Sequence, residues 1–265
     1  MGTQKAYGSP KWPGVNPAVG AAASSGQPTN QKITAAVGAF AAAYKNHLTS
    51  GTVTPGSRGT GGGIAPATGR RSSRGGGGGS GAKRLRAANA GAKLGHFLST
   101  ARQSGLREAL RQFDLSDLRD KSLDEFLDAV VDRLSGDGGL IDDETLNRAM
   151  SLTIDELAEN IESVDEFETL LESGDVDVEE MLQILYSNIL SLNFEQKEYG
   201  VVREKISREN TSDFFERARG IIRAIVRDEL SRERDLSSLN WNSPDGKRMA
   251  DEINHEVLDI LIHNE

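Results

Sequence analysis

The chain lacks cysteine and long hydrophobic runs. Its 265 residues include no cysteine, which excludes disulfide bonds, thiolate metal ligands and a cysteine nucleophile. No apolar run approaches the roughly 18 residues that a membrane-spanning helix requires. The start of the chain also lacks a basic segment followed by an apolar stretch, which is the pattern of a secretory signal. We therefore expect a soluble cytoplasmic protein with no membrane attachment.

Recognisable catalytic motifs are missing as well. The histidines are His47, His96, His255 and His263. Their spacing gives no H-E-x-x-H zinc pattern, and no serine stands in a G-x-S-x-G elbow. The glycine run at 75–79 has no G-x-x-x-x-G-K-[ST] spacing, so a phosphate-binding loop is not expected. The sequence thus predicts a scaffold that is not an enzyme and needs neither cofactor nor metal.

Acidic residues are scarce in the first part of the chain. Residues 1–112 contain 15 Lys and Arg against one acid, whereas residues 113–265 contain 16 Lys and Arg against 39 Asp and Glu. Such asymmetry is typical of a basic arm that binds nucleic acid. It is equally typical of an arm that lies on an acidic partner or on the acidic body of its own chain. The sequence leaves these alternatives open.

Aromatic residues are few, and the first 17 residues hold two of the six Tyr and Trp, at Tyr7 and Trp12. Gly2 follows the initiator methionine, so methionine removal would leave an unhindered amine with a pKa of about 7.7–8.0. Because prolines fix φ and remove backbone donors, we expect residues 1–30 to form an extended, mobile tail. Either the tail docks into a partner through its amine and rings, or the rings pack on the protein's own helices.

The remaining chain has helical periodicity with no alternating β-strand pattern. We expect an amphipathic helix at 31–49, a flexible Gly/Ser-rich linker at 50–82 and an acidic helical domain at 83–265. The helices expected in that domain lie at 83–98, 106–113, 122–134, 143–159, 164–172, 178–194, 211–230 and 244–262. Ser122 and Glu125 have the spacing of a capping box. The predicted fold class is an all-α bundle with an extended tail.

Three groups of residues carry a family resemblance. They are Met1-Gly-Thr3 with Tyr7 and Pro10; Lys93-Leu-Gly-His-Phe-Leu98 with Ser122–Phe126, Gly136–Gly138 and Asp142-Asp143; and Asp235-Leu-Ser-Ser-Leu-Asn-Trp241. In these residues the chain resembles the QatB proteins of the bacterial Qat anti-phage defence system. It departs from the pattern at Gln4, where a serine is expected, and in its glycine-heavy linker.

The resemblance implies a non-enzymatic partner of an ATPase (QatA), a QueC-like enzyme (QatC) and a TatD-like nuclease (QatD). QueC enzymes activate a deazaguanine carboxylate and pass it to ammonia. A relative that accepts a protein amine would conjugate the group to Gly2, with Thr3, Tyr7, Pro10 and Trp12 guiding the tail. The alternative is a helical adaptor that assembles the ATPase and the nuclease, with its basic arm on nucleic acid.

Overall fold

The computed structural model describes residues 14–24, 28–49, 80–118, 121–136, 141–229, 234, 236 and 239–264. Every regular element in these ranges is a helix, which confirms the predicted all-α class for the described part of the chain. The elements are α1 (Val15–Ala23), α2 (Asn30–Thr49), α3 (Ser80–Ser104), α4 (Leu106–Gln112), the 3-10 helix η1 (Ser116–Leu118), α5 (Leu123–Ser135), α6 (Ile141–Leu157), α7 (Val164–Ser173), α8 (Val178–Arg203), α9 (Arg208–Glu229) and α10 (Pro244–His263).

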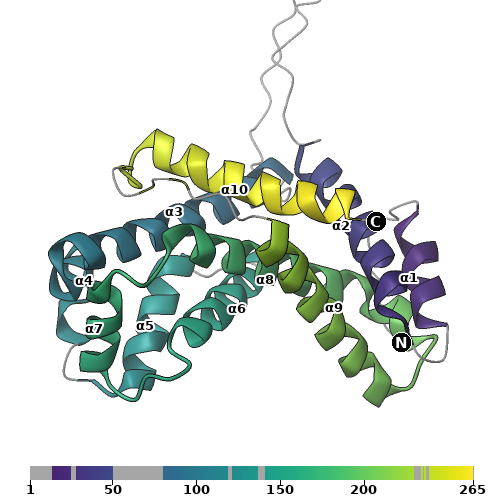
Figure 1. The fold of residues 1–265 in the computed structure, drawn as a ribbon, viewed down its shortest axis with the longest axis horizontal. Coiled ribbons are helices and arrows are strands. Elements are labelled where there is room, and N and C mark those ends of the chain that lie inside the picture. Colours follow the sequence, from purple (N-terminus) through teal and green to yellow (C-terminus); the bar gives the residue numbers. More distant parts are fainter. Residues whose placement is uncertain are drawn as a thin grey trace, which may run out of the picture.

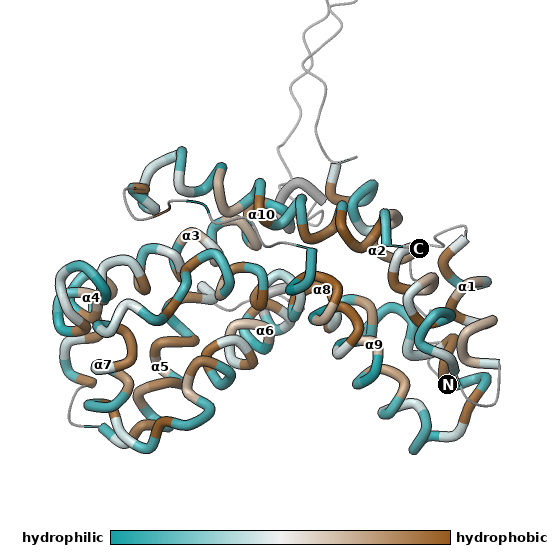
Figure 2. The backbone as a smooth tube through the Cα atoms, viewed as in Figure 1, coloured by the Kyte–Doolittle hydropathy of each residue, from teal (hydrophilic) through white to brown (hydrophobic). Residues whose placement is uncertain are grey.

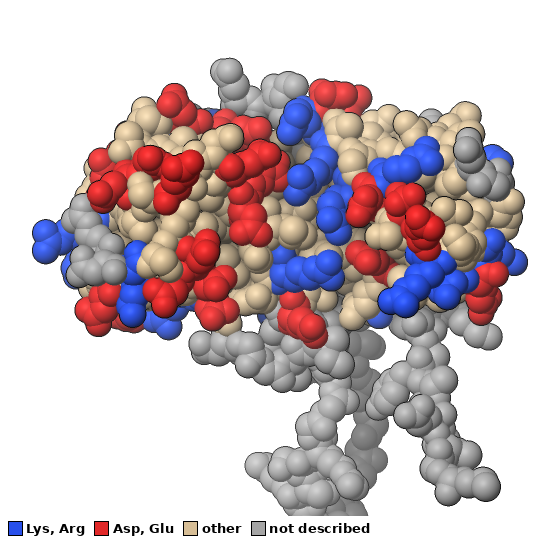
Figure 3. Space-filling model, turned by 90° about the horizontal axis from the view of Figure 1, so that it is seen from below, with Lys and Arg blue, Asp and Glu red and all other residues tan. Residues whose placement is uncertain are grey.

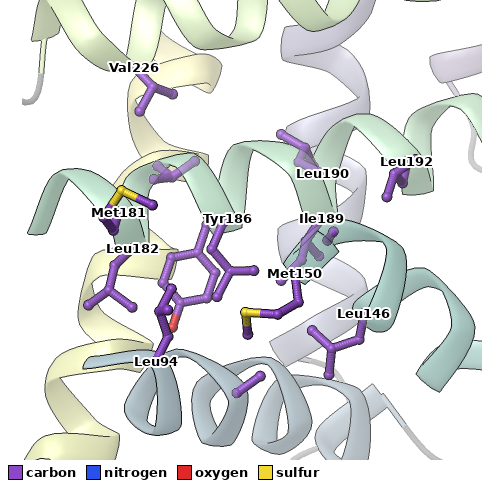
Figure 4. Packing of buried hydrophobic residues seen from close by; sticks show 14 of the residues in the cluster. Leu94, Leu146, Met150, Met181, Leu182, Tyr186, Ile189, Leu190, Leu192 and Val226 are labelled. Carbon is purple, nitrogen blue, oxygen red and sulfur yellow. The ribbon is translucent and has the colours of Figure 1, made fainter. Parts of the chain in front are cut away.

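Helix α8 is the centre of the fold. It buries nearly every residue from Met181 to Phe194, the polar Ser187, Asn188 and Ser191 included, because neighbouring helices surround it. Helices α6, α9, α10 and α3 pack around it. Figure 4 shows Tyr186 of α8 between Leu94 of α3 and Met150 of α6, with Val226 of α9 on the other side of α8.

The other helices lie on either side of α8 (Figure 1). Helices α3 to α7 form one side, and α1, α2 and α9 form the other. Helix α10 lies across both and packs on α3 and α2. Figure 2 shows hydrophobic stretches of the chain, in brown, where these helices meet. One core cluster extends from Val15 in α1 to Leu261 in α10, so helix α2 belongs to the same core as the acidic helices.

Helix α1 replaces part of the expected extended tail. The tail was expected to run through residue 30, but Val15–Ala23 is helical. Pro17 is accommodated because it lies in the first turn, where backbone N–H groups have no partner within the helix. Val15 and Val19 are fully buried against the rest of the core. Packing of this small apolar face explains why the segment folds despite its proline.

The local signals in the acidic region are confirmed. Ser122 accepts a hydrogen bond from the backbone N–H of Glu125, and the Glu125 side chain accepts one from the backbone N–H of Ser122. Helix α5 ends at Gly136, which has φ 114°. Helix α8 continues to Arg203, nine residues beyond the expected end at Phe194. Its extra turns remain helical because Glu198 and Val202 are buried against neighbouring helices.

Candidate functional site

The expected tail residues Gly2, Thr3, Tyr7, Pro10 and Trp12 lie outside the described residues, and so does most of the 50–82 linker. The structure does describe the point to which the tail is joined. Gly14 is exposed with φ 100°, and helix α1 directly behind it packs on α2 and α8. The 13 residues before Gly14 are therefore attached to a fixed helix. Fully extended, they could reach about 40 Å from it.

Two of the family-like motifs meet at one joint between α3 and the start of α10. The Trp241 ring is buried and lies over Gly95, where an added β-carbon would be 2.6 Å from the indole. The residue after each of these continues the contact, since the side-chain amide of Asn242, just past the second motif, lies 2.8 Å from His96 Nε2. The pairs Gly95-His96 and Trp241-Asn242 thus fasten the start of α10 onto α3.

The start of α10 completes this joint. Ser243 caps the helix by accepting a hydrogen bond from the N–H of Gly246, and Pro244 occupies the first turn. A β-carbon on Gly246 would lie 2.4 Å from Trp241 Cα, so only glycine fits against the tryptophan backbone. The sequence Trp241-Asn-Ser-Pro-Asp-Gly246 therefore forms a compact helix start that places the indole in the core.

The motif Lys93–Leu98 on α3 also contacts the C-terminal end of α5. Lys93 Nζ donates to the carbonyl oxygen of Arg133 at 3.1 Å. Arg133 in turn donates to the Phe113 carbonyl at 2.8 Å and to Asp114 Oδ2 at 2.6 Å. The motif residues that the structure describes are thus joints between helices rather than a cluster of reactive groups.

The residues of these joints lie within the part of the chain that matches a known protein family. Residues 76–261 match the family described as Qat anti-phage system associated protein QatB, which covers most of the chain. The chain belongs to the QatB family. The match contains both motifs of the α3–α10 joint, while Met1–Pro10, α1 and α2 lie before it. No curated protein and no solved structure matches the chain.

Several ionisable side chains are buried, or partly buried, between packed helices. Arg234 lies between two helices, with its backbone N–H donating to Glu179 Oε2 at 3.3 Å and its guanidinium paired with Glu256. Burial raises the pKa of Glu179, and the charge of Arg234 opposes that effect. Glu198 is 3% exposed, and burial raises the pKa of its carboxyl group. One oxygen of Glu198 has no hydrogen-bond partner among the described residues.

The histidines have separate contacts. His96 on α3 contacts Asn242, His255 lies 3.9 Å from Asp251 within α10, and His263 Nδ1 lies 2.6 Å from the Asp259 carbonyl oxygen. No group of three or more His, Asp and Glu within the described ranges is arranged to hold a metal ion.

Among the described helices, none has the length and apolar character needed to cross a membrane.

A groove between α6 and α8 was not expected from the sequence. Helices α6 and α9 both pack on α8, and Arg223 of α9 reaches Glu156 of α6 at 2.8 Å. The groove has a volume of about 380 Å³ and is lined by Glu144, Thr145, Arg148, Leu192, Glu195, Gln196 and Tyr199. Tyr199 is 44% exposed, and its ring stacks on Phe215 with centroids 6.3 Å apart. The sequence signal for it was a tyrosine directly after the polar run Glu195–Glu198.

Charge is distributed unevenly over the underside of the molecule, the side on which α6 and α9 diverge from α8 (Figures 1 and 3). Asp and Glu cover the left part of Figure 3, whereas Lys and Arg gather along the middle among further acids. Residues 114–180, which include α5, α6 and α7, contain 23 acidic and four basic side chains. This charge favours solubility and basic or cationic partners.

Proposed function

We propose that this Qat component is a non-catalytic protein substrate and binding partner of a QueC-like enzyme, which conjugates a deazaguanine-type group to the amine of Gly2. Membership of the QatB family supports a role in the Qat system. The observation that carries the substrate role is the anchored helix α1. Its buried face fixes the point to which residues 2–13 are joined, a segment of 12 residues that begins with a small glycine once the initiator methionine is removed.

The proposed reaction needs only an unhindered amine from this chain. The Gly2 nitrogen attacks the carbonyl carbon of an adenylated carboxylate, so a C–N bond forms and the C–O bond to AMP breaks. The amine loses a proton in the same step, and the product is an amide. Because the pKa of an α-amino group is about 7.7–8.0, a useful fraction is neutral near physiological pH. Glycine adds no side chain that could clash in a narrow pocket.

The helical body has the role of a docking module. Once the body binds the enzyme, the tail meets the active site as an intramolecular partner, with an effective concentration on the order of millimolar. Thr3, Tyr7, Pro10 and Trp12 then orient the tail. The body contributes specificity, and the tail contributes the reacting atom.

A pair of glycine variants tests this function. Gly2→Val still permits methionine removal but places a branched side chain beside the amine, so we expect it to abolish conjugation during co-expression with the QueC-like partner. Gly20→Ala in α1 is the control, because a β-carbon at Gly20 meets no atom within 4 Å. Intact-mass measurement of both proteins gives the result. Modification of Gly2→Val at the wild-type level would refute the proposal.

The uneven charge favours the second candidate, an adaptor for the ATPase and the nuclease whose basic arm binds nucleic acid. Replacing Arg70, Arg71 and Arg74 by Gln separates the two functions. The adaptor requires a loss of DNA affinity and a shallower salt dependence in this variant. The substrate role requires unchanged conjugation.

A further inference from the structure

We propose that Asn188 is a positioning residue, which fixes the angle at which helices α6 and α9 lie on the central helix α8. Its side chain is fully buried, and both ends of its amide group are bonded to other helices. The inference concerns the shape of the helical body and does not depend on whether Gly2 is conjugated.

The nitrogen end of the amide joins α8 to α6. Asn188 Nδ2 donates to Thr153 Oγ1 at 3.1 Å. The Thr153 hydroxyl donates its single hydrogen to the carbonyl oxygen of Ala149 at 2.8 Å, so toward Asn188 it can only accept. Both side chains are fully buried, so water does not compete for this bond.

The oxygen end of the same amide joins α8 to α9. Asn188 Oδ1 accepts from Arg223 Nη2 at 3.0 Å. Because a guanidinium only donates hydrogen bonds and Thr153 can only accept, the amide has a single orientation between its two partners. Arg223 Nη2 also lies 2.8 Å from Glu156 Oε2, and this ion pair joins α9 to α6 directly. The three helices are thus tied to one another at one level.

Other buried polar residues of α8 do not have this arrangement. Ser191 and Asn193 donate to the carbonyl oxygens of Ser187 and Ile189, which belong to α8 itself. These bonds satisfy the side chains within their own helix. The hydrogen bonds of Asn188 instead define where two neighbouring helices must lie.

Positioning, rather than stability, is the distinctive contribution of such a network. Burying an amide costs free energy, and its hydrogen bonds offset much of that cost. A leucine at position 188 would have the same branched shape and would add apolar contact. Apolar contact is non-directional, however, whereas hydrogen bonds to fixed partners favour one arrangement of the helices.

The network lies beside the groove between α6 and α8. The groove-lining residues of α8 begin roughly one helical turn after Asn188, and those of α6 lie at 144–148, before Thr153. The angle that is set at Asn188 therefore determines how far the two helices separate along the groove. It also determines the shape of the face on which α6 and α9 diverge (Figure 1).

Double electron–electron resonance on the full chain tests this inference. The chain has no cysteine, so Arg148→Cys on α6 and Ser212→Cys on α9 place spin labels at two exposed positions and nowhere else. We expect a narrow distance distribution when residue 188 is asparagine. Asn188→Leu should roughly double its width, with a urea midpoint no lower than that of the control, because cores lose uniqueness before they lose stability.

The matched control is Asn193→Leu. It makes the same change in a buried residue of the same helix, but the amide that it removes bonds within α8. We expect it to leave the width of the distribution unchanged. Thr153→Val keeps the shape of the side chain and removes only the link to α6, so it should broaden the distribution as Asn188→Leu does.

Three results would overturn the inference. The first is an unchanged width in Asn188→Leu or in Thr153→Val. The second is an Asn188→Leu chain that fails to fold or has a lower urea midpoint than Asn193→Leu, because the network would then act through stability. The third is equal broadening in Asn193→Leu, because loss of any buried amide would then loosen α8. All of these measurements use the chain alone, so failure of Gly2 conjugation does not affect them.

Discussion

The indole of Trp241 lies so close over Gly95 that a β-carbon added to the glycine would be 2.6 Å from the ring. The contact joins α3 to the start of α10, and it explains why two motifs nearly 150 residues apart in the sequence occur together. Because Trp241 is 1% exposed and surrounded by core residues, the ring cannot move aside without opening the joint.

We therefore expect Gly95→Ala to destabilise the fold by about 1–3 kcal/mol through overpacking, although alanine is the better helix former. Gly220→Ala in α9 is the matched control, since its β-carbon meets no atom within 4 Å. That change should stabilise by up to about 1 kcal/mol. Urea unfolding of both variants measures the difference, and equal effects would contradict the close contact.

Arg234 fastens the segment before α10 to α8. Its guanidinium lies beside Glu179 and Glu256, and the Glu179 side chain is only 4% exposed. We expect Arg234→Ala to cost about 2–4 kcal/mol, because it leaves a buried carboxylate without its cation. Arg248→Ala is the control, because its pairs with Asp245 and Glu252 are exposed. A control loss above about 1 kcal/mol would contradict the distinction between buried and exposed pairs.

The buried carboxyl group of Glu198 should make the free energy of unfolding depend on pH. Burial raises the pKa of its carboxyl group in the folded state above the ordinary value of 4.5. The protonated group is therefore favoured by folding, and its contribution is present below pH 4.5 and lost as pH rises through the raised pKa. We expect Glu198→Gln to be more stable than the unmodified chain at pH 8 and to lose this advantage toward pH 4. Thermal unfolding across this range tests the sign, and a constant difference would refute it.

Much of the helical body could be predicted because its signals are local. The capping box at Ser122 and Glu125 and the proline after Ser243 mark helix starts that the structure confirms. Apolar spacing likewise located α2, α7 and α9 within a few residues. These signals depend on backbone groups and on neighbours in the same helix, so a single sequence contains them.

Features that depend on distant parts of the chain could not be predicted. Helix α1 forms because Val15 and Val19 pack on other helices of the core, and this packing outweighs the effect of Pro17. The fit of Trp241 over Gly95 and the exposed ring of Tyr199 depend on helix packing in the same way. For the tail, the resemblance to QatB proteins supplied the hypothesis of Gly2 conjugation, and that remains a prediction.

The most direct test of the central claim is tandem mass spectrometry of the N-terminal peptide, from chain produced with and without the QueC-like partner. The account predicts a mass increment that appears only with active partner and is present in the smallest N-terminal fragment, which contains Gly2. An unmodified N-terminal glycine in the presence of active enzyme, or an increment located on another residue, would contradict it.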